Sequence, residues 1–219
     1  FPKLKKHLDR FVSVITSDNK PYGIHRTRNE YFFKSEKILA LRKCVGKPLF
    51  SYADFDTYVN QAFYVIKSER INLKYLTALL NSKLVSFWLK YKGKMQGDNY
   101  QVDKEPILNI PIKNIEDTKP FKILVDYIIY LKQEKKENYI IEFFERVIDI
   151  AVYELYFKEE LHSKGFGILE VLESELIPFD NSFETIERVY KKLSDKNHKV
   201  AYNVNFIDTL DIVKTIENK

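Results

Sequence analysis

The sequence predicts an α+β fold, with a small mixed or antiparallel sheet and flanking helices followed by a helical hairpin and a mainly helical C-terminal part. Three short segments between residues 37 and 66 are rich in aromatic and β-branched side chains and are bounded by turn residues. After Pro120 the apolar residues instead recur at helical spacing in two long stretches. At 219 residues and 45% hydrophobic content, the chain can bury one large core or two small ones.

The N-terminal part is expected to begin with a short amphipathic helix, because Leu4, Leu8 and Phe11 fall on one helical face behind Pro2. Turn residues dominate the next stretch, residues 17–23. Strands are then expected at residues 37–42, 48–52 and 57–66, separated by turns at 45–48 and 53–56.

A long helix is predicted after these strands. Asn72 is suited to cap it, and an apolar stripe carries it to about Lys92. Gly93 and Gly97 then indicate a polar loop that reaches Asp103. A short strand over residues 108–112 closes this region, which we take as residues 1–117.

Residues 118–219 are predicted to form a separate helical region. Apolar spacing predicts helices over 121–131 and 140–155, and the charged run 132–138 makes the turn between them. This hairpin occupies about residues 121–157. Two weaker helices are expected near residues 183–193 and 206–216, in a tail to which the sequence assigns no role.

The charge is distributed unevenly along the chain. Residues 1–117 contain 21 Lys and Arg against 12 Asp and Glu, whereas residues 118–219 contain 15 against 19. A basic first region and a mildly acidic second one favour contact between the first region and a polyanion. Ordinary surface lysines are the alternative explanation.

Several classes of protein are disfavoured by the composition. A charge interrupts every apolar run before it is long enough to span a bilayer. Cys44 is the single cysteine, which excludes an internal disulfide and indicates a reducing compartment, so we expect the cytoplasm. Because the sequence opens at Phe1 without a methionine, we expect it to be part of a longer polypeptide.

No catalytic or metal-binding set is recognisable, so we expect this piece to have no enzymatic activity and no cofactor of its own. The four histidines are isolated, and no phosphate-binding glycine loop or nucleophile elbow occurs. Residues 103–105, Asp-Lys-Glu, lack the second carboxylate of a metal nuclease and fit a solvated turn better. Residues 109–112 lack the second proline and the aromatic residue of a methyltransferase Asn-Pro-Pro-Tyr loop.

Two segments concentrate the donors that base readout requires. In the first, Arg can contact guanine bidentately and Asn can do the same on adenine; its residues are His25, Arg26, Thr27, Arg28 and Asn29. A solvated basic turn, paired with Glu30 or Glu36, explains the same residues.

The second segment combines glycines, lysines and amides between residues 90 and 101. Its lysines can attract phosphates and its amides suit base edges; the candidates are Lys92, Lys94, Gln96, Asn99 and Gln101, to which we add Lys43. A helix C-terminus followed by an ordinary glycine loop is the alternative, and it explains the amide cluster poorly.

Four phrases of the sequence, at residues 33–39, 74–84, 93–112 and 152–156, resemble the TaqI-like C-terminal specificity domain of type II adenine methyltransferases. The resemblance covers roughly residues 2–157. It rests on the order and spacing of four phrases: residues 33–39, Phe-Lys-Ser-Glu-Lys-Ile-Leu; residues 74–84, a helix ending in Leu-Asn-Ser-Lys-Leu; residues 93–104 followed by Leu-Asn-Ile-Pro-Ile at 108–112, as in single-chain type IIG enzymes; and residues 152–156, Val-Tyr-Glu-Leu-Tyr.

The resemblance implies a restriction–modification role as a target-recognition domain. The intact enzyme would carry an upstream methyltransferase domain that binds S-adenosylmethionine and methylates adenine at N6, often with a Mg²⁺-dependent endonuclease. The present piece would bind double-stranded DNA in its major groove and choose the sequence. The resemblance implies, in addition, a prokaryotic cell and activity at its nucleoid. The assignment of individual base contacts comes from residue chemistry, not from the resemblance.

Two other classes of function stay open. In one, the acidic helical region is a protein-interaction module that docks a partner subunit, and the basic segments are incidental. In the other, the chain binds RNA, for which Tyr100 is the clear loop aromatic able to stack on an unpaired base. We rank the RNA-binding reading last.

Overall fold

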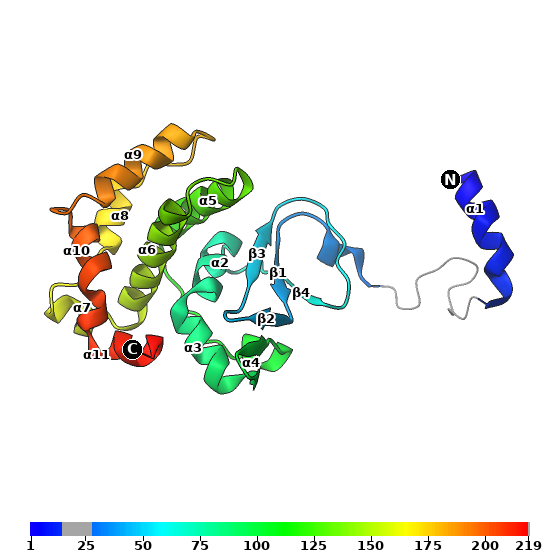
Figure 1. Cartoon of the computed structure of the whole chain (residues 1–219), viewed down its shortest axis with the longest axis horizontal. Coiled ribbons are helices and arrows are strands. Elements are labelled where there is room, and N and C mark those ends of the chain that lie inside the picture. Colours follow the sequence, from blue (N-terminus) through cyan, green and yellow to red (C-terminus); the bar gives the residue numbers. More distant parts are fainter. Residues whose placement is uncertain (15–27, 219) are drawn as a thin grey trace.

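The computed structural model describes residues 1–14 and 28–218, and it confirms the α+β class (Figure 1). Two small antiparallel sheets with flanking helices replace the single predicted sheet. The elements up to residue 108 are α1 (Pro2–Leu8), η1 (Asp9–Val14), η2 (Glu30–Phe33), β1 (Lys37–Leu41), β2 (Lys43–Val45), β3 (Phe50–Ala53), β4 (Phe63–Ile66), α2 (Leu73–Asn81), α3 (Lys83–Lys92), β5 (Lys94–Gln96), β6 (Asn99–Gln101) and α4 (Lys104–Leu108).

The remaining described elements are helical. They are α5 (Lys119–Gln133), α6 (Asn138–Tyr156), α7 (Lys158–Ser163), α8 (Leu169–Glu175), α9 (Phe183–Leu193), α10 (Lys199–Phe206), η3 (Ile207–Thr209) and α11 (Asp211–Glu217). The predicted hairpin of α5 and α6 is confirmed, as is a helix at 183–193. The predicted helix over 206–216 is divided between the end of α10, η3 and α11, and the sequence did not predict α7 or α8.

The first sheet has the strand order β3-β1-β4, with both pairs antiparallel. The prediction of a strand over residues 57–66 was wrong for its first half. The Asn60 carboxamide oxygen accepts from the Ala62 N–H at 2.9 Å, and the Asn60 carbonyl accepts from the Phe63 N–H at 3.2 Å. This turn keeps the chain out of the sheet until Phe63.

The second sheet has the order β2-β6-β5. The chain passes from β1 of the first sheet directly into β2 of the second at Arg42. The Arg42 N–H donates to the carbonyl of Ala62 at 2.9 Å, and the Arg42 carbonyl accepts from the Val102 N–H at 2.8 Å. The predicted loop from Lys92 to Asp103 was wrong, because β5 and β6 pair as a hairpin within it.

The predicted long helix after Asn72 is two helices. The Asn72 carboxamide caps α2 by accepting from the Tyr75 N–H at 3.0 Å, as expected. Ser82 then interrupts the run: its hydroxyl donates to the Leu79 carbonyl at 2.7 Å and accepts from the Val85 N–H at 3.3 Å. One serine therefore ends α2 and begins α3, and the apolar periodicity passes through the break unchanged.

The strand predicted over residues 108–112 was also wrong. Residues 104–108 form α4, with Pro106 in its first turn, where its missing N–H costs no helical hydrogen bond. The Trp88 indole donates to the Pro106 carbonyl at 3.3 Å, and the Asn109 carboxamide donates to the backbone carbonyl of Glu105 at 3.0 Å. These contacts turn the chain onto α3 and away from either sheet.

The hydrophobic interior consists of two clusters. The smaller one lies between the sheets and α2–α3, and the larger one lies among α5, α6 and the helices that follow. Helix α2 contributes to both, because Leu76 and Leu80 pack in the smaller cluster while Tyr75 and Leu79 pack in the larger. Figure 1 shows α5 and α6 lying between α2–α3 and α8–α10.

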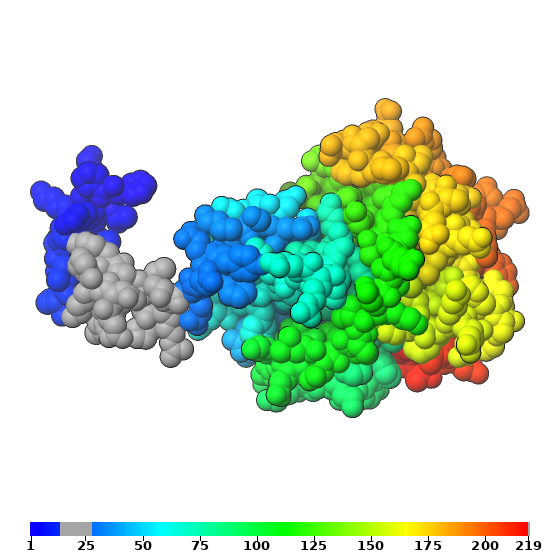
Figure 2. Space-filling view, turned by 180° about the vertical axis from the view of Figure 1, so that it is seen from behind, coloured from blue at the N-terminus to red at the C-terminus, as the bar shows by residue number. Residues whose placement is uncertain are grey.

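The first fourteen residues lie apart from this body in Figures 1 and 2. Helix α1 has the predicted amphipathic pattern and buries none of its residues. Figure 2 shows the sheets and the helices after residue 28 as one continuous body. None of the helices in residues 1–14 and 28–218 is long and apolar enough to span a membrane.

Glu217 holds the last helix against both halves of the body. Its carboxylate, on a side chain only 2% exposed, pairs with Arg146 of α6 and lies 2.7 Å from the Lys83 ammonium of α3. The Tyr153 hydroxyl donates to it at 3.0 Å, and Arg146 also pairs with Asp208. The C-terminal segment is thus joined electrostatically to the start of α3.

Asp149 lies beside this network on α6 and accepts from the Lys83 N–H at 2.8 Å. Burial raises the pKa of Asp149 to about 7, aided by the Glu217 charge and opposed by that hydrogen bond and by the Lys83 and Arg146 charges. The native chain therefore holds this proton at pH values where the unfolded chain has lost it. Stability contributed by the neutral carboxyl is complete near pH 4 and is lost as the pH rises to about 7.

Asp149→Asn should remove this pH dependence, because the carboxamide oxygen still accepts from Lys83 and carries no buried charge. We expect the variant to melt several degrees above the unmodified chain at pH 8 and within a degree or so of it at pH 4. Thermal denaturation followed by circular dichroism at the two pH values measures the difference. A variant that melts below the unmodified chain at pH 8 contradicts the assignment.

Candidate nucleic-acid interface

The second sheet buries one face and presents the other to solvent. Cys44 and Tyr100 are buried and Met95 is half-buried, so the middle residue of each strand points into the smaller core. Because side chains alternate along a strand, the flanking residues share the opposite face. We call this the outer face; its residues are Lys43, Val45, Lys94, Gln96, Asn99 and Gln101.

Strand register arranges the outer face in two rows. Lys43 is opposite Gln101, which is opposite Lys94, and we call these three the lysine row. Val45 is opposite Asn99, which is opposite Gln96, and we call these the amide row. Neighbouring strands are about 4.8 Å apart, so each row of three spans about 10 Å.

Two glycines allow the hairpin to form where it does. A Cβ on Gly93 would lie 2.5 Å from the Leu89 carbonyl oxygen, so only glycine can connect α3 to β5 at this approach. Gly97 has a φ of +59° and is followed by Asp98, whose φ is not positive. Glycine first, with positive φ, is the pattern of the two-residue turns that match strand twist.

The lysine row is not uniformly available for an anion. Asp103 lies 3.7 Å from the Lys94 ammonium, and its carboxylate accepts from the Gln101 carboxamide at 3.4 Å. Lys43 forms no ion pair with any described residue. In the amide row, Gln96 and Asn99 likewise have no side-chain hydrogen bond within the described chain, so both carboxamides face solvent with their donors and acceptors unused.

The structure therefore brings Lys43 beside four predicted site residues of the second segment: Lys94, Gln96, Asn99 and Gln101. Lys92 is not among them. It is the last residue of α3, exposed, with its ammonium 5.9 Å from the Trp88 ring. His25, Arg26 and Thr27 lie outside the described residues, so their joint action with the outer face stays a prediction.

Arg28 and Asn29 are described and exposed. Asn29 caps η2, its carboxamide oxygen accepting from the Tyr31 N–H at 3.0 Å. A bidentate adenine contact uses the oxygen and the nitrogen of the same carboxamide, and in Asn29 one of the two lone pairs of that oxygen already accepts from Tyr31. The structure gives this residue a local structural role that the sequence did not indicate.

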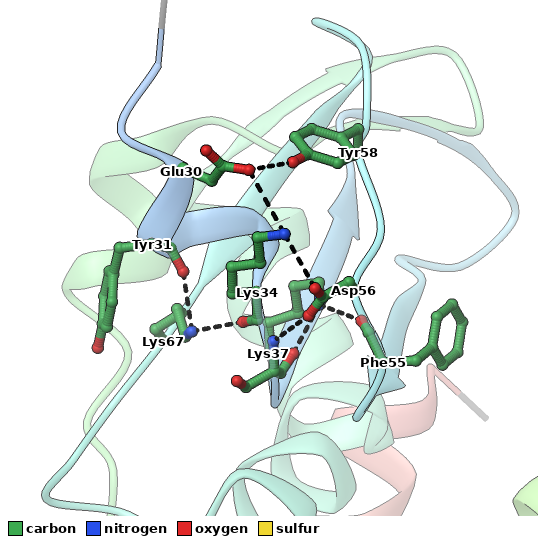
Figure 3. Close-up of polar contacts among 9 residues, drawn as sticks. Glu30, Tyr31, Lys34, Lys37, Phe55, Asp56, Tyr58 and Lys67 are labelled. Atoms are coloured by element: carbon green, nitrogen blue, oxygen red, sulfur yellow. Dashed lines mark hydrogen bonds and ion pairs between the residues drawn. The ribbon is translucent and has the colours of Figure 1, made fainter.

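Some lysines that contribute to the basic charge of the first region bind carbonyl and carboxylate groups within that region (Figure 3). The Lys67 ammonium donates to the carbonyls of Tyr31 at 3.0 Å and Lys34 at 2.7 Å, and it lies 4.2 Å from the centre of the Tyr31 ring. Lys34 pairs with Asp56 at 3.0 Å and with Glu30 at 3.4 Å. These contacts hold η2 against the first sheet.

Lys37 is completely buried at the start of β1. Its ammonium donates to the carbonyls of Ser35 at 2.6 Å and Phe55 at 2.5 Å (Figure 3). Burial lowers the pKa of Lys37, and the charge on Lys67 lowers it further. Three of the lysines behind the charge count, at 34, 37 and 67, are therefore engaged in holding the chain together.

Sequence reasoning missed Val45 at the outer face and Arg42 beside it. Val45 is 84% exposed although its side chain is apolar. Its position next to Cys44, which is buried in the same short strand, was the available signal that Val45 faces outward. Arg42 donates to the Gln61 carbonyl at 3.2 Å and lies 5.0 Å over the Tyr64 ring. It lines a hollow of about 530 Å³ that also includes Lys43 and Gln101, directly beside the lysine row.

Comparison with known proteins matches residues 5–112 to the TaqI-like C-terminal specificity domain. Two relatives are the type II methyltransferases M.HincII of Haemophilus influenzae and M.HindII of Haemophilus influenzae strain Rd. Each is 37% identical over 70 residues, which is 31% of this chain. The matched segment covers only 14% of the length of either relative.

Proposed function

We propose that this chain is the sequence-recognition part of a restriction–modification DNA methyltransferase, because residues 5–112 match the TaqI-like C-terminal specificity domain. In this proposal it binds duplex DNA and selects the target, while chemistry takes place in another domain. The similarity to two type II methyltransferases supports the methyltransferase assignment.

The observation that carries the proposal is the outer face. The major groove is about 12 Å wide and admits a two-stranded β ribbon, which is the size of the β5–β6 hairpin. The face offers amides at its amide row and ammonium groups at its lysine row, and these are the groups that contact base edges and phosphates in the groove. No packing role within the described chain accounts for that combination.

The wider enzyme follows from the family and is part of the proposal. An upstream methyltransferase domain of the same polypeptide would bind S-adenosylmethionine and modify adenine at N6. A fused endonuclease using Mg²⁺ would cut unmodified DNA. We infer that the enzyme acts on DNA in the prokaryotic cytoplasm, and that the present chain contributes recognition and no catalytic residue.

We expect the chain to bind duplex DNA with a Kd of about 10⁻⁶–10⁻⁴ M near physiological salt, because only part of the DNA clamp is present. The affinity should fall linearly in log–log form as salt increases, through release of counterions from phosphates. Fluorescence anisotropy with labelled duplex, single-stranded DNA and double-stranded RNA of the same sequence measures this, and we expect duplex DNA to bind tightest.

Absence of duplex binding at low salt, together with recovery of a protein partner in a pull-down, contradicts the proposal and favours the protein-interaction module. Tighter binding to RNA than to duplex DNA also contradicts it. Stable folding of the chain, checked by circular dichroism in the same buffer, is the control for both measurements.

A further inference from the structure

We propose that the amide row selects an A·T base pair, with Gln96 or Asn99 on adenine and Val45 on the methyl group of thymine. This inference rests on the proposed function and assigns the chemistry of one part of the outer face. It concerns Val45, Asn99 and Gln96, which stand opposite one another on β2, β6 and β5.

The paired donor and acceptor of a carboxamide in the row match the paired acceptor and donor of adenine. In the major groove adenine presents the N7 acceptor beside the N6 donor, and a carboxamide matches this pair by donating from nitrogen and accepting on oxygen. Guanine presents two acceptors, N7 and O6, so the carboxamide oxygen would face O6 without a proton between them. Gln96 and Asn99 have both groups free, as far as the described chain extends.

Val45 supplies the second half of the base pair. Its side chain is 84% exposed at the edge of the outer face, where it contributes little to folding. Thymine is the base with a methyl group in the major groove, and apolar contact with that methyl is a recognised form of readout. The row spans about 10 Å from β2 to β5, so an amide and Val45 can contact the two bases of a single pair or of adjacent pairs.

The surroundings of the row keep it directed at bases. Asp98, at the turn next to Gln96 and Asn99, is exposed, and its carboxylate is repelled by phosphate. Contact between the tip of the hairpin and the DNA backbone is therefore unfavourable. Contact with base edges is favoured, because the amino group of cytosine can donate to a carboxylate there. The lysine row, farther from the tip, is where phosphate contact is expected.

The test begins with selection from a library of random duplexes by the whole 219-residue chain at low salt. We expect the selected motif to contain an A·T pair that disappears when Gln96→Ala and Asn99→Ala are combined, while the other positions stay. The matched control is Gln133→Ala with Asn197→Ala, which removes two exposed amides from the helical region. It should leave the motif unchanged.

Two atomic substitutions in the selected duplex then identify the contacts. Replacing the adenine by 7-deazaadenine removes the N7 acceptor and should weaken binding of the unmodified chain about 5- to 150-fold, with no effect on the doubly substituted variant. Replacing the thymine by uracil removes the methyl group and should weaken the unmodified chain by a smaller factor. That loss should vanish in Val45→Ala.

The outcomes separate this inference from the proposed function. A selected motif that survives Gln96→Ala with Asn99→Ala, or that loses a G·C pair instead, overturns the A·T assignment and leaves duplex recognition standing. If 7-deazaadenine does not weaken binding of the unmodified chain, the A·T assignment is likewise overturned and duplex recognition stands. A chain that binds duplex but selects no motif, or does not bind at all, overturns the proposed function and this inference with it.

Discussion

Changing Lys43 and Lys94 together to glutamate should strongly weaken the binding of the chain to duplex DNA. Each substitution removes a cation from the lysine row and places a carboxylate opposite the phosphates, so the two changes together alter the local charge by four units. We expect a loss of roughly 100-fold or more at low salt, and a salt slope smaller by about two. Anisotropy titrations at several salt concentrations give both quantities.

The control for this variant carries the same charge change elsewhere. Lys196→Glu with Lys199→Glu alters two exposed lysines of the helical region and should reduce affinity only a few-fold, through net charge. Equal losses in the two variants would show that total charge, not the outer face, determines binding. Because Lys94 lies near Asp103, the melting temperature of the double variant must be compared with that of the unmodified chain.

The second large effect is expected in stability, from Arg146→Leu. The Arg146 side chain is 14% exposed and pairs with Glu217, which is 2% exposed, and with Asp208. Its removal takes away the guanidinium that pairs with the Glu217 carboxylate in the interior, while the Lys83 ammonium stays 2.7 Å from that carboxylate. Breaking a buried pair from one side costs about 3–5 kcal/mol, which corresponds to a fall in melting temperature of roughly 10 °C.

Arg188→Leu is the matched control, because Arg188 is exposed on α9 and forms no ion pair within the described chain. It should change the unfolding free energy by less than about 0.5 kcal/mol. Adding Glu217→Gln to Arg146→Leu removes the buried carboxylate charge and should restore part of the loss. If Arg146→Leu and Arg188→Leu have the same melting temperature, the ion pairs around Glu217 do not stabilise the C-terminal helix.

The parts of the fold that were predicted correctly are those with long, uninterrupted periodicity. Helices α5 and α6 repeat their apolar stripe over 15 and 19 residues, which leaves no alternative to a helical hairpin. The Asn72 cap was predicted because its chemistry is local. Ser82 was missed because the apolar stripe continues on both sides of it, and the partner that accepts from Lys83, Asp149, is 66 residues away.

The hairpin was missed although its pattern is present in the sequence. Met95 and Tyr100 each stand between two polar residues, on either side of the Gly97-Asp98 pair, which is the alternation expected of two strands and a tight turn. Strands of three residues give too few repeats to outweigh a glycine-rich loop. The role of the candidate residues in binding therefore stays a prediction, and their arrangement in rows was not foreseen.

The charge count overstated the basic surface of the first region. Lys34, Lys37 and Lys67 contribute to the positive first region but bind carbonyls and carboxylates of that region. Composition cannot separate such lysines from those facing solvent, because the difference depends on which carbonyl groups the folded chain brings near them. The outer face, with Lys43 as its unpaired cation in the described chain, is a smaller basic surface than the count suggests.

The six side chains of the outer face add little to the core beneath them, and this has a consequence for how such a domain changes over time. Exchanging one exposed residue for another generally costs less than about 0.5 kcal/mol. Mutations at Val45, Gln96 or Asn99 can therefore accumulate in a population without unfolding the protein, while Cys44, Tyr100 and Gly93 hold the same backbone. Under the proposed function, a lineage built on this sheet would acquire a new target sequence by point mutation alone.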